Sequence, residues 1–185
     1  MIVILEWLTD DISDDDEREI VSFGVARLKV ALIALVLIIV TGIFLHETFR
    51  CVLVIAILLP LRQNAGGYHM KSSRICAVIS YVVLLFSMIA IKYFEITHRL
   101  AFVLLIFSAI VIILISPIGS ENHPLDDTER KVYGRRTRII CCFDSALFMI
   151  LLFLDASYFY KPILMAELLV AIALIIGRIM ESGKE

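Results

Sequence analysis

Long apolar stretches alternate with short polar ones along most of this chain. Six stretches are apolar enough to form membrane helices: 28–45, 49–61, 75–91, 100–115, 139–154 and 163–180. A helix that crosses a bilayer needs about 20 residues, so the second stretch, which ends just after Pro60, is short for a span. It approaches that length only by borrowing flanking residues or by tilting. We predict an all-α membrane protein of about six transmembrane helices, with four spans plus re-entrant segments as the alternative.

The composition supports the same class of protein. Hydrophobic residues make up 61% of the 185 residues, and the mean hydropathy is +0.95. Soluble domains carry about 45–50% apolar residues, and a soluble fold of this length cannot hide so much apolar surface. Inside lipid the backbone must satisfy its own hydrogen bonds, and the sequence shows no short alternating strands, so the spans are predicted to be helices.

The first 26 residues differ from the rest of the chain. Residues 1–9 are mostly apolar and include Trp7, whereas residues 10–19 are acidic. We predict a short amphipathic helix on the membrane surface, at the start of a single domain, 1–185, whose transmembrane core is 27–185. A signal peptide is not expected, because acidic residues stand where a basic segment should be.

The placement of Lys and Arg predicts the orientation. With six spans and the N-terminus inside, four of the 17 Lys and Arg residues fall outside: Arg50, Lys92, Arg99 and Lys161. Cytoplasmic loops are enriched in Lys and Arg, so we expect this orientation, with both termini in the cytoplasm. The net charge of −2 indicates no particular partner, and none is expected among nucleic acids.

The polar stretch 62–76 carries the candidate chemistry. Its notable residues are Arg62, Gln63, Asn64, Gly66, Gly67, His69 and Cys76. A thiol attacks as its thiolate, and His69 is a candidate to take the Cys76 proton. Ser72 or Ser73 suits the N-cap of the following helix, which would place Cys76 in or near the first turn, where the helix dipole favours negative charge.

The spacing restricts how such a site can be built. On one continuous helix, His69 and Cys76 would lie about 10.5 Å apart along the axis, too far for a hydrogen bond. His69 is therefore expected on a loop that folds back over the helix start, which the glycine pair permits because glycine tolerates positive φ. Asn64 and Gln63 are candidates to orient the imidazole, and Arg62 to bind a substrate carboxylate or an oxyanion. The plainer alternative is a solvated loop histidine and a structural cysteine.

Four of these residues, in their order between apolar stretches, resemble the accessory gene regulator B family: Arg62, Gly67, His69 and Cys76. That family consists of membrane endopeptidases that process the precursor of a Gram-positive quorum-sensing peptide. The resemblance covers about residues 20–185 and implies that His69 and Cys76 are the catalytic pair. It also implies that the site needs Arg62 and Gly67, and that the protein lies in the cell membrane of a Gram-positive bacterium, with its site on the cytoplasmic side.

A second polar stretch, 116–131, adds to the resemblance. It opens with Ser116-Pro117 and runs through a Pro-Leu pair into a basic segment, as the proline-bearing segment of that family does. The basic residues here either anchor the chain on anionic lipid or form a dock for the acidic tail of a precursor: Arg130, Lys131, Arg135, Arg136 and Arg138. The residues just before them, 126–129, are expected to form the acidic first turn of a cytoplasmic helix.

The resemblance implies a mechanism that these residues can perform. Cys76 attacks the peptide bond at the C-terminal end of the future signal and releases a charged tail, while His69 protonates the leaving amine. A Cys or Ser of the peptide then attacks the thioester and closes a thiolactone or lactone ring. The expected partners are the small precursor peptide and the lipid bilayer. A homodimer is compatible with so small a membrane enzyme, and no cofactor or metal is expected.

Two carboxylates within apolar stretches, Asp144 and Glu167, keep other functions open. An ionisable residue inside the membrane is a candidate functional site. A small transporter of a peptide or an ion would use these two residues and would not need Cys76, and a non-catalytic scaffold is a third possibility. Asp144 is expected near the interface, and Glu167 is expected to pair with Lys161 or Arg178 or to extend toward the headgroups.

Overall fold

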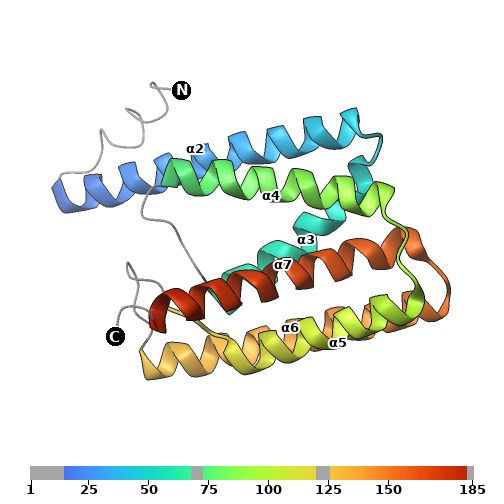
Figure 1. Ribbon diagram of the computed structural model, residues 1–185. Coiled ribbons are helices and arrows are strands. Elements are labelled where there is room, and N and C mark those ends of the chain that lie inside the picture. Colours follow the sequence, from blue (N-terminus) through green and yellow to red (C-terminus); the bar gives the residue numbers. More distant parts are fainter. Residues whose placement is uncertain (1–14, 68–72, 120–125, 183–185) are drawn as a thin grey trace.

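The computed structural model describes residues 15–67, 73–119 and 126–182. Within these residues it contains six helices and no strand, labelled as in Figure 1. The helices are α2 (Asp15–Phe44), α3 (Thr48–Ala65), α4 (Ser73–Tyr93), α5 (His98–Ile115), α6 (Asp127–Phe153) and α7 (Ser157–Ser182). The predicted all-α fold is confirmed. Of the surface helix predicted over 1–19, residues 1–14 lie outside the described residues.

Consecutive helices run in opposite directions, so the bundle has two ends (Figure 1). One end holds the start of α2, the end of α3, the start of α4, the end of α5, the start of α6 and the end of α7, and we call it the basic end. The other end, which we call the far end, holds the short connections from α2 to α3, α4 to α5 and α6 to α7. This grouping of segments is the one that six antiparallel helices predict, and no re-entrant hairpin occurs in the described part of the chain.

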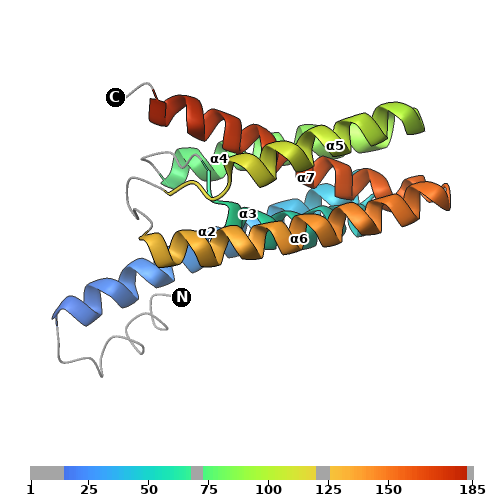
Figure 2. The ribbon, with the colours of Figure 1, turned by 90° about the horizontal axis from the view of Figure 1, so that it is seen from below.

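The helices pack in two groups joined by α3. α5, α6 and α7 pack on one another, and α6 and α7 also pack on α3, whereas α2 packs on both α3 and α4 (Figures 1 and 2). The first group buries a core that includes Leu61, Ile112 and Leu174, and the second buries Val54 and Met88. α3 contributes to both cores, so its end at Ala65 is held firmly within the bundle.

Four helices are long and apolar enough to cross a membrane: α3, α4 from Ile75, α5, and α7 as far as Met180. α2 contributes a shorter apolar stretch, Leu35–Phe44, and α6 begins with a charged segment before its apolar part. At 1.5 Å per residue, the 27 residues of α6 still extend about 40 Å, longer than the hydrocarbon layer is thick. Large apolar side chains also cover the outside, as at Phe153, which is 92% exposed. Such a surface suits lipid, and the chain is a membrane protein.

Two helices extend beyond the predicted apolar stretches. α3 continues through Pro60 to Ala65, because a proline removes only its own N–H bond, and a helix packed among others tolerates that loss. Asn64 Nδ2 also donates to the Pro60 carbonyl oxygen at 2.8 Å. α2 begins at Asp15, inside the acidic run that was predicted to belong to the surface segment. A helix N-terminus accommodates acidic residues, since its dipole favours negative charge.

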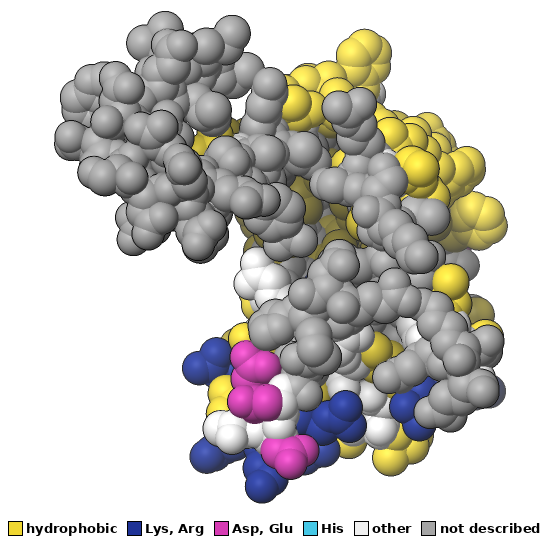
Figure 3. Space-filling model, turned by 90° about the vertical axis from the view of Figure 1, so that its left-hand side faces the viewer, with side chains coloured by type: hydrophobic (Ala, Val, Ile, Leu, Met, Phe, Trp, Pro, Cys, Tyr) yellow, Lys and Arg dark blue, Asp and Glu magenta, His cyan; other side chains and the backbone are white. Residues whose placement is uncertain are grey.

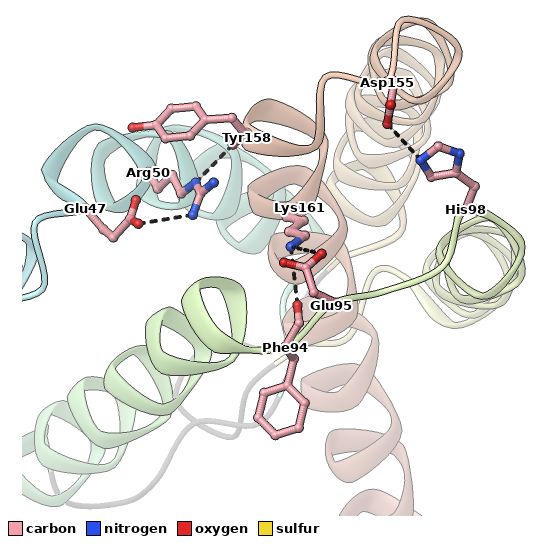
Figure 4. Close-up of polar contacts among 8 residues, drawn as sticks. All are labelled: Glu47, Arg50, Phe94, Glu95, His98, Asp155, Tyr158 and Lys161. Atoms are coloured by element: carbon pink, nitrogen blue, oxygen red, sulfur yellow. Dashed lines mark hydrogen bonds and ion pairs between the residues drawn. The ribbon is translucent and has the colours of Figure 1, made fainter.

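At the far end, Arg50 ties the start of α3 to the start of α7 (Figure 4). Its Nη1 lies 3.2 Å from Glu47 Oε1, its Nε donates to the Tyr158 carbonyl oxygen at 3.3 Å, and its guanidinium carbon lies 4.1 Å from the Tyr158 ring centre. Pro162, four residues after Tyr158, has no N–H for that carbonyl. Arg50 therefore supplies the donor that the helix lacks.

Two further contacts close the far end (Figure 4). Lys161 Nζ donates to the Phe94 carbonyl oxygen at 3.3 Å and lies 3.5 Å from Glu95 Oε2. His98 Nε2 lies 3.0 Å from Asp155 Oδ1. Each of the three far-end connections is thus held by a polar side chain, and the candidate site lies at the opposite end of the bundle.

Candidate active site

The chain leaves α3 through a turn of two glycines at the basic end. Gly66 and Gly67 have φ values of 72° and 115°, which other residues rarely adopt. The Gly66 N–H donates to the Arg62 carbonyl oxygen at 3.1 Å, and Arg62 Nη1 donates to the Gly66 carbonyl oxygen. A Cβ on Gly67 would collide with the Arg62 guanidinium. Both glycines adopt the positive φ that the sequence permits at this pair, and Arg62 folds back over the end of its helix.

The second polar stretch docks on this turn. The Ile118 N–H donates to the Ala65 carbonyl oxygen at 3.1 Å, and Gly66 and Ile118 form an isolated parallel bridge. A Cβ on Gly66 would collide with the Ile118 carbonyl oxygen. The Ile118 side chain is buried in the core beside Leu61 and Leu174. The two stretches singled out in the sequence therefore meet in space, although about fifty residues separate them in the chain.

Cys76 lies in the first turn of α4, as predicted, because the helix begins at Ser73. It is half-buried, and the Arg62 guanidinium is close enough to interact with it electrostatically. The helix N-terminus and the arginine both present positive potential to the sulfur. The structure thus brings together Arg62, the glycine turn and Cys76. Ser72 and the side chain of Ser73, the two predicted caps, lie outside what the structure describes.

The other predicted site residues are placed differently. His69 lies in 68–72, outside the described residues, so its pairing with Cys76 stays a prediction. Gln63 is exposed, and Asn64 points its amide back to the Pro60 carbonyl oxygen. Because the amide of Asn64 already donates within its own helix, Gln63 is the better of the two candidates for orienting an imidazole.

The acidic turn predicted before the basic run is confirmed as the start of α6. The Glu129 N–H donates to Asp126 Oδ1 at 2.6 Å, and the Asp126 N–H donates to Glu129 Oε2 at 3.3 Å. This reciprocal pair is a capping box, which satisfies two N–H groups that the helix cannot. The capping box fixes the start of α6 and so the start of the basic segment. Figure 3 shows acidic and basic side chains close together on this end of the molecule.

A basic hollow of about 510 Å³ lies beside the docked segment, between it and α6. Four cations line it: Arg130, Lys131, Arg138 and Arg178. Ser116 also lines it. Arg135 and Arg136 are exposed and lie outside its wall. The basic run therefore divides into a part that faces the hollow and a part that faces outward.

Glu167 lies between three helices and is fully buried, with 0% exposure. Its Oε2 accepts a hydrogen bond from Ser108 of α5 at 3.1 Å, and its Oε1 accepts one from Ser145 of α6 at 3.0 Å. The predicted pairing with Lys161 is wrong, because Lys161 binds the far-end connection instead. Pairing with Arg178 is wrong too, since eleven residues of helix separate the two by about 16 Å.

Asp144 is also buried against other helices, at 6% exposure, and its predicted position near the membrane interface stays a prediction. It interacts electrostatically with Glu167, and its Oδ2 has no hydrogen-bond partner among the described residues. The two carboxyl groups are enclosed because α6 turns Asp144 toward the bundle and not toward lipid. They form a polar cluster within the helix packing, apart from Cys76.

Sequence reasoning missed three residues of this end: Ser116, Ile118 and Arg178. The sequence marks Ser116 only as the opening residue of the second polar stretch, and Ile118 is one apolar residue within that stretch. Arg178 was considered as a partner for Glu167, whereas it lines the hollow. Their shared position follows from the docking of 116–118 on α3, which no local pattern encodes.

The fold defines a polytopic helical membrane protein, and the thiol beside Arg62 makes its basic end a candidate enzymatic site. Residues 3–175 match the family described as Accessory gene regulator B. The chain belongs to this family, which gives it a role in the accessory gene regulator system.

Two curated relatives come from Clostridium perfringens. One, from strain 13 (type A), is named "Putative AgrB-like protein 2"; it is 21% identical over 176 residues, which cover 89% of this chain and 82% of that protein. The other, from strain SM101 (type A), is named "Putative AgrB-like protein"; it is 22% identical over 137 residues, which cover 70% of this chain and 64% of that protein. No solved structure matches the chain.

Proposed function

We propose that this chain is a membrane cysteine endopeptidase that cleaves the C-terminal tail from a small precursor peptide and enables its cyclisation to a quorum-sensing autoinducer. The observation that supports this most directly is the position of Cys76. It lies in a first helical turn, within electrostatic reach of Arg62 and at the end of the bundle where the two polar stretches meet. A merely structural cysteine needs none of these neighbours.

In the first step of the proposed reaction, Cys76 Sγ bonds to the carbonyl carbon and the bond from that carbon to the tail nitrogen breaks. The thiol proton passes to His69 and then to the leaving amine. Arg62 has five N–H donors, enough to hold the Gly66 carbonyl oxygen and to stabilise an oxyanion at the same time. The product is a peptidyl thioester on Cys76 and a free tail.

In the second step, a Cys or Ser of the peptide attacks the thioester carbonyl. The ring bond forms, the bond to Cys76 breaks, and the proton of the attacking group returns through His69 to the Cys76 sulfur. No water is consumed, so the ring is lighter by one water than the linear cleaved peptide. Exclusion of water at a membrane surface favours this outcome over hydrolysis.

We also propose that the basic end faces the cytoplasm and receives an acidic tail. The outward-facing cations Arg135 and Arg136, which lie outside the wall of the hollow, would hold that tail. The orientation is supported by the enrichment of Lys and Arg at this end. The tail dock is supported by the exposure of these side chains, which lie at the same end of the bundle as Cys76.

The test is a cleavage assay in proteoliposomes with a precursor peptide encoded near this chain, read by mass spectrometry. Cys76→Ala, Cys76→Ser and His69→Ala should abolish the ring product, and Arg62→Gln should slow its formation. Cys142→Ala is the control, because Cys142 is an exposed cysteine on another helix. Cleavage that survives Cys76→Ala would show that the nucleophile is misassigned.

The alternative function, transport, has its own observation in the buried pair Asp144 and Glu167. A transporter would give no cleavage product with any variant, and Asp144→Asn or Glu167→Gln would abolish flux of the peptide or ion. The endopeptidase proposal expects the opposite pattern, in which both neutral variants still cleave the precursor.

A further inference from the structure

The basic hollow has the features of an anion site. Besides its four cations, its wall includes Ser116, which is 6% exposed and whose Oγ has no hydrogen-bond partner among the described residues. A buried hydroxyl without a partner is costly. A ligand oxygen in the hollow would offset that cost, and the surrounding cations select an oxygen that carries negative charge.

The cations of α6 that line the hollow share one face of the helix. Lys131, Gly134 and Arg138 are spaced by three and four residues, and Arg130 lies eight residues before Arg138. Such spacings place residues on one side of a helix. Arg136, two residues before Arg138, lies about 200° around the axis and points away. The helix therefore presents a defined set of cations to the hollow.

The hollow lies at the boundary between the polar and the apolar parts of the bundle. Arg138 is the last cation of α6 before its apolar part, which begins at Ile139. Two apolar residues from the end of α5, Leu114 and Ile115, form part of the same wall, and Leu114 is 77% exposed. The hollow thus has a cationic side and an apolar edge that lies on the outer surface of the bundle.

We propose that this hollow binds the headgroup phosphate of an anionic phospholipid. Arg130, Lys131 and Arg138 would contact the phosphate oxygens, Ser116 would donate its hydroxyl hydrogen, and the acyl chains would run along Leu114. Basic pockets between membrane helices suit such headgroups. An acidic peptide fits less well, because a water-soluble tail gains nothing from an exposed apolar edge at the level of the lipid.

This lipid site is separate from the proposed chemistry at Cys76, and neither depends on the other. The lipid would occupy one side of segment 116–118, whose other side docks on Gly66. An occupied hollow would therefore hold that segment in place between α3 and α6.

The test is native mass spectrometry of the full chain in a lipid-free maltoside detergent, titrated with dioleoylphosphatidylglycerol. The parent should retain one tightly bound lipid, and Arg138→Gln should weaken its binding about fivefold, the effect of one cation near a membrane surface. Ser116→Ala should weaken it about threefold. Arg136→Gln is the matched control, with the same charge change on the opposite face of α6, and should leave the affinity within about twofold.

Three arms decide the identity of the ligand. Dioleoylphosphatidylcholine should not compete, inorganic phosphate should compete only at far higher concentration, and a polyglutamate peptide should not displace the bound lipid. Equal weakening by Arg136→Gln and Arg138→Gln would overturn the site, because attraction would then be diffuse. Displacement by polyglutamate would make the hollow a peptide subsite, and phosphate binding as tight as the lipid's would make it a plain anion site. Circular dichroism of each variant confirms that it is folded.

Discussion

Replacing Glu167 tests what holds α5, α6 and α7 together. Ser108 Oγ lies 2.9 Å from the Leu105 carbonyl oxygen and 3.1 Å from Glu167 Oε2, but a hydroxyl has one hydrogen to donate. A glutamine at this position would donate its amide hydrogen to Ser108, which would then donate to Leu105. Its carbonyl oxygen would accept from Ser145, as Oε1 does now. Glu167→Gln therefore keeps every hydrogen bond, whereas Glu167→Ala removes both bonds between helices.

The magnitudes follow from burial and bonding. The side chain is fully buried, so truncation to alanine leaves a cavity as well as unpaired hydroxyl groups. Large-to-small changes at buried sites cost about 2–5 kcal/mol, and each lost hydrogen bond costs about 0.5–1.5 kcal/mol. We expect Glu167→Ala, with two bonds lost, to lower the free energy of unfolding by about 3–8 kcal/mol and Glu167→Gln by less than about 1 kcal/mol.

The assay is unfolding of the purified chain by dodecyl sulfate in mixed micelles, followed by circular dichroism and pulse proteolysis. Ser145→Ala should cost about 1 kcal/mol more than Ser87→Ala, because Ser145 donates across helices, whereas the buried Ser87 donates to the Val83 carbonyl oxygen of its own helix. If Glu167→Gln costs as much as Glu167→Ala, the negative charge and not the hydrogen bonding is what the helices require, and the reasoning is wrong.

Two further changes probe the ends of the bundle with the same unfolding titration. Gly66→Ala should cost about 2–4 kcal/mol, because its φ is positive and its Cβ would collide with the Ile118 carbonyl oxygen. The control is Gly24→Ala, at a helical position with open space around it, which should be neutral or stabilising by up to about 1 kcal/mol. If both substitutions lowered the free energy of unfolding by similar amounts, the docking of Ile118 on Gly66 would be contradicted. Arg50→Ala should cost about 1–3 kcal/mol, because the Tyr158 carbonyl oxygen loses its donor and the Tyr158 ring loses its cation. An unchanged unfolding midpoint would show that Arg50 does not stabilise the far end.

The helix positions were largely predictable, and the exceptions have local causes. Each apolar stretch became a helix, because lipid offers the backbone no hydrogen bonds. Pro60 was read as the end of its stretch, yet α3 continues to Ala65 because packing on both helix groups outweighs one missing bond. The predicted acidic first turn at 126–129 does begin a helix, and this helix, α6, continues without a break through the charged segment into the apolar stretch after Ile139.

The candidate site was predictable only in part. The positive φ values of the glycine pair and the place of Cys76 in a first helical turn follow from local rules, and both are confirmed. The docking of Ile118 on Gly66 was not predictable, because nothing in either segment specifies the other. The proposed role of His69 remains a prediction, since it lies outside the described residues.

The sequence by itself determined that this chain is a helical membrane protein, where the apolar part of each helix lies, and that a glycine pair after α3 permits the backbone to turn. The tertiary structure decided which distant residues meet: Gly66 with Ile118, and Glu167 with Ser108 and Ser145. The reason is that a membrane helix is apolar on the side that faces lipid as well as on the side that faces the core. Its pattern therefore does not reveal which face turns inward, and only the packing of the helices against one another settles that rotation.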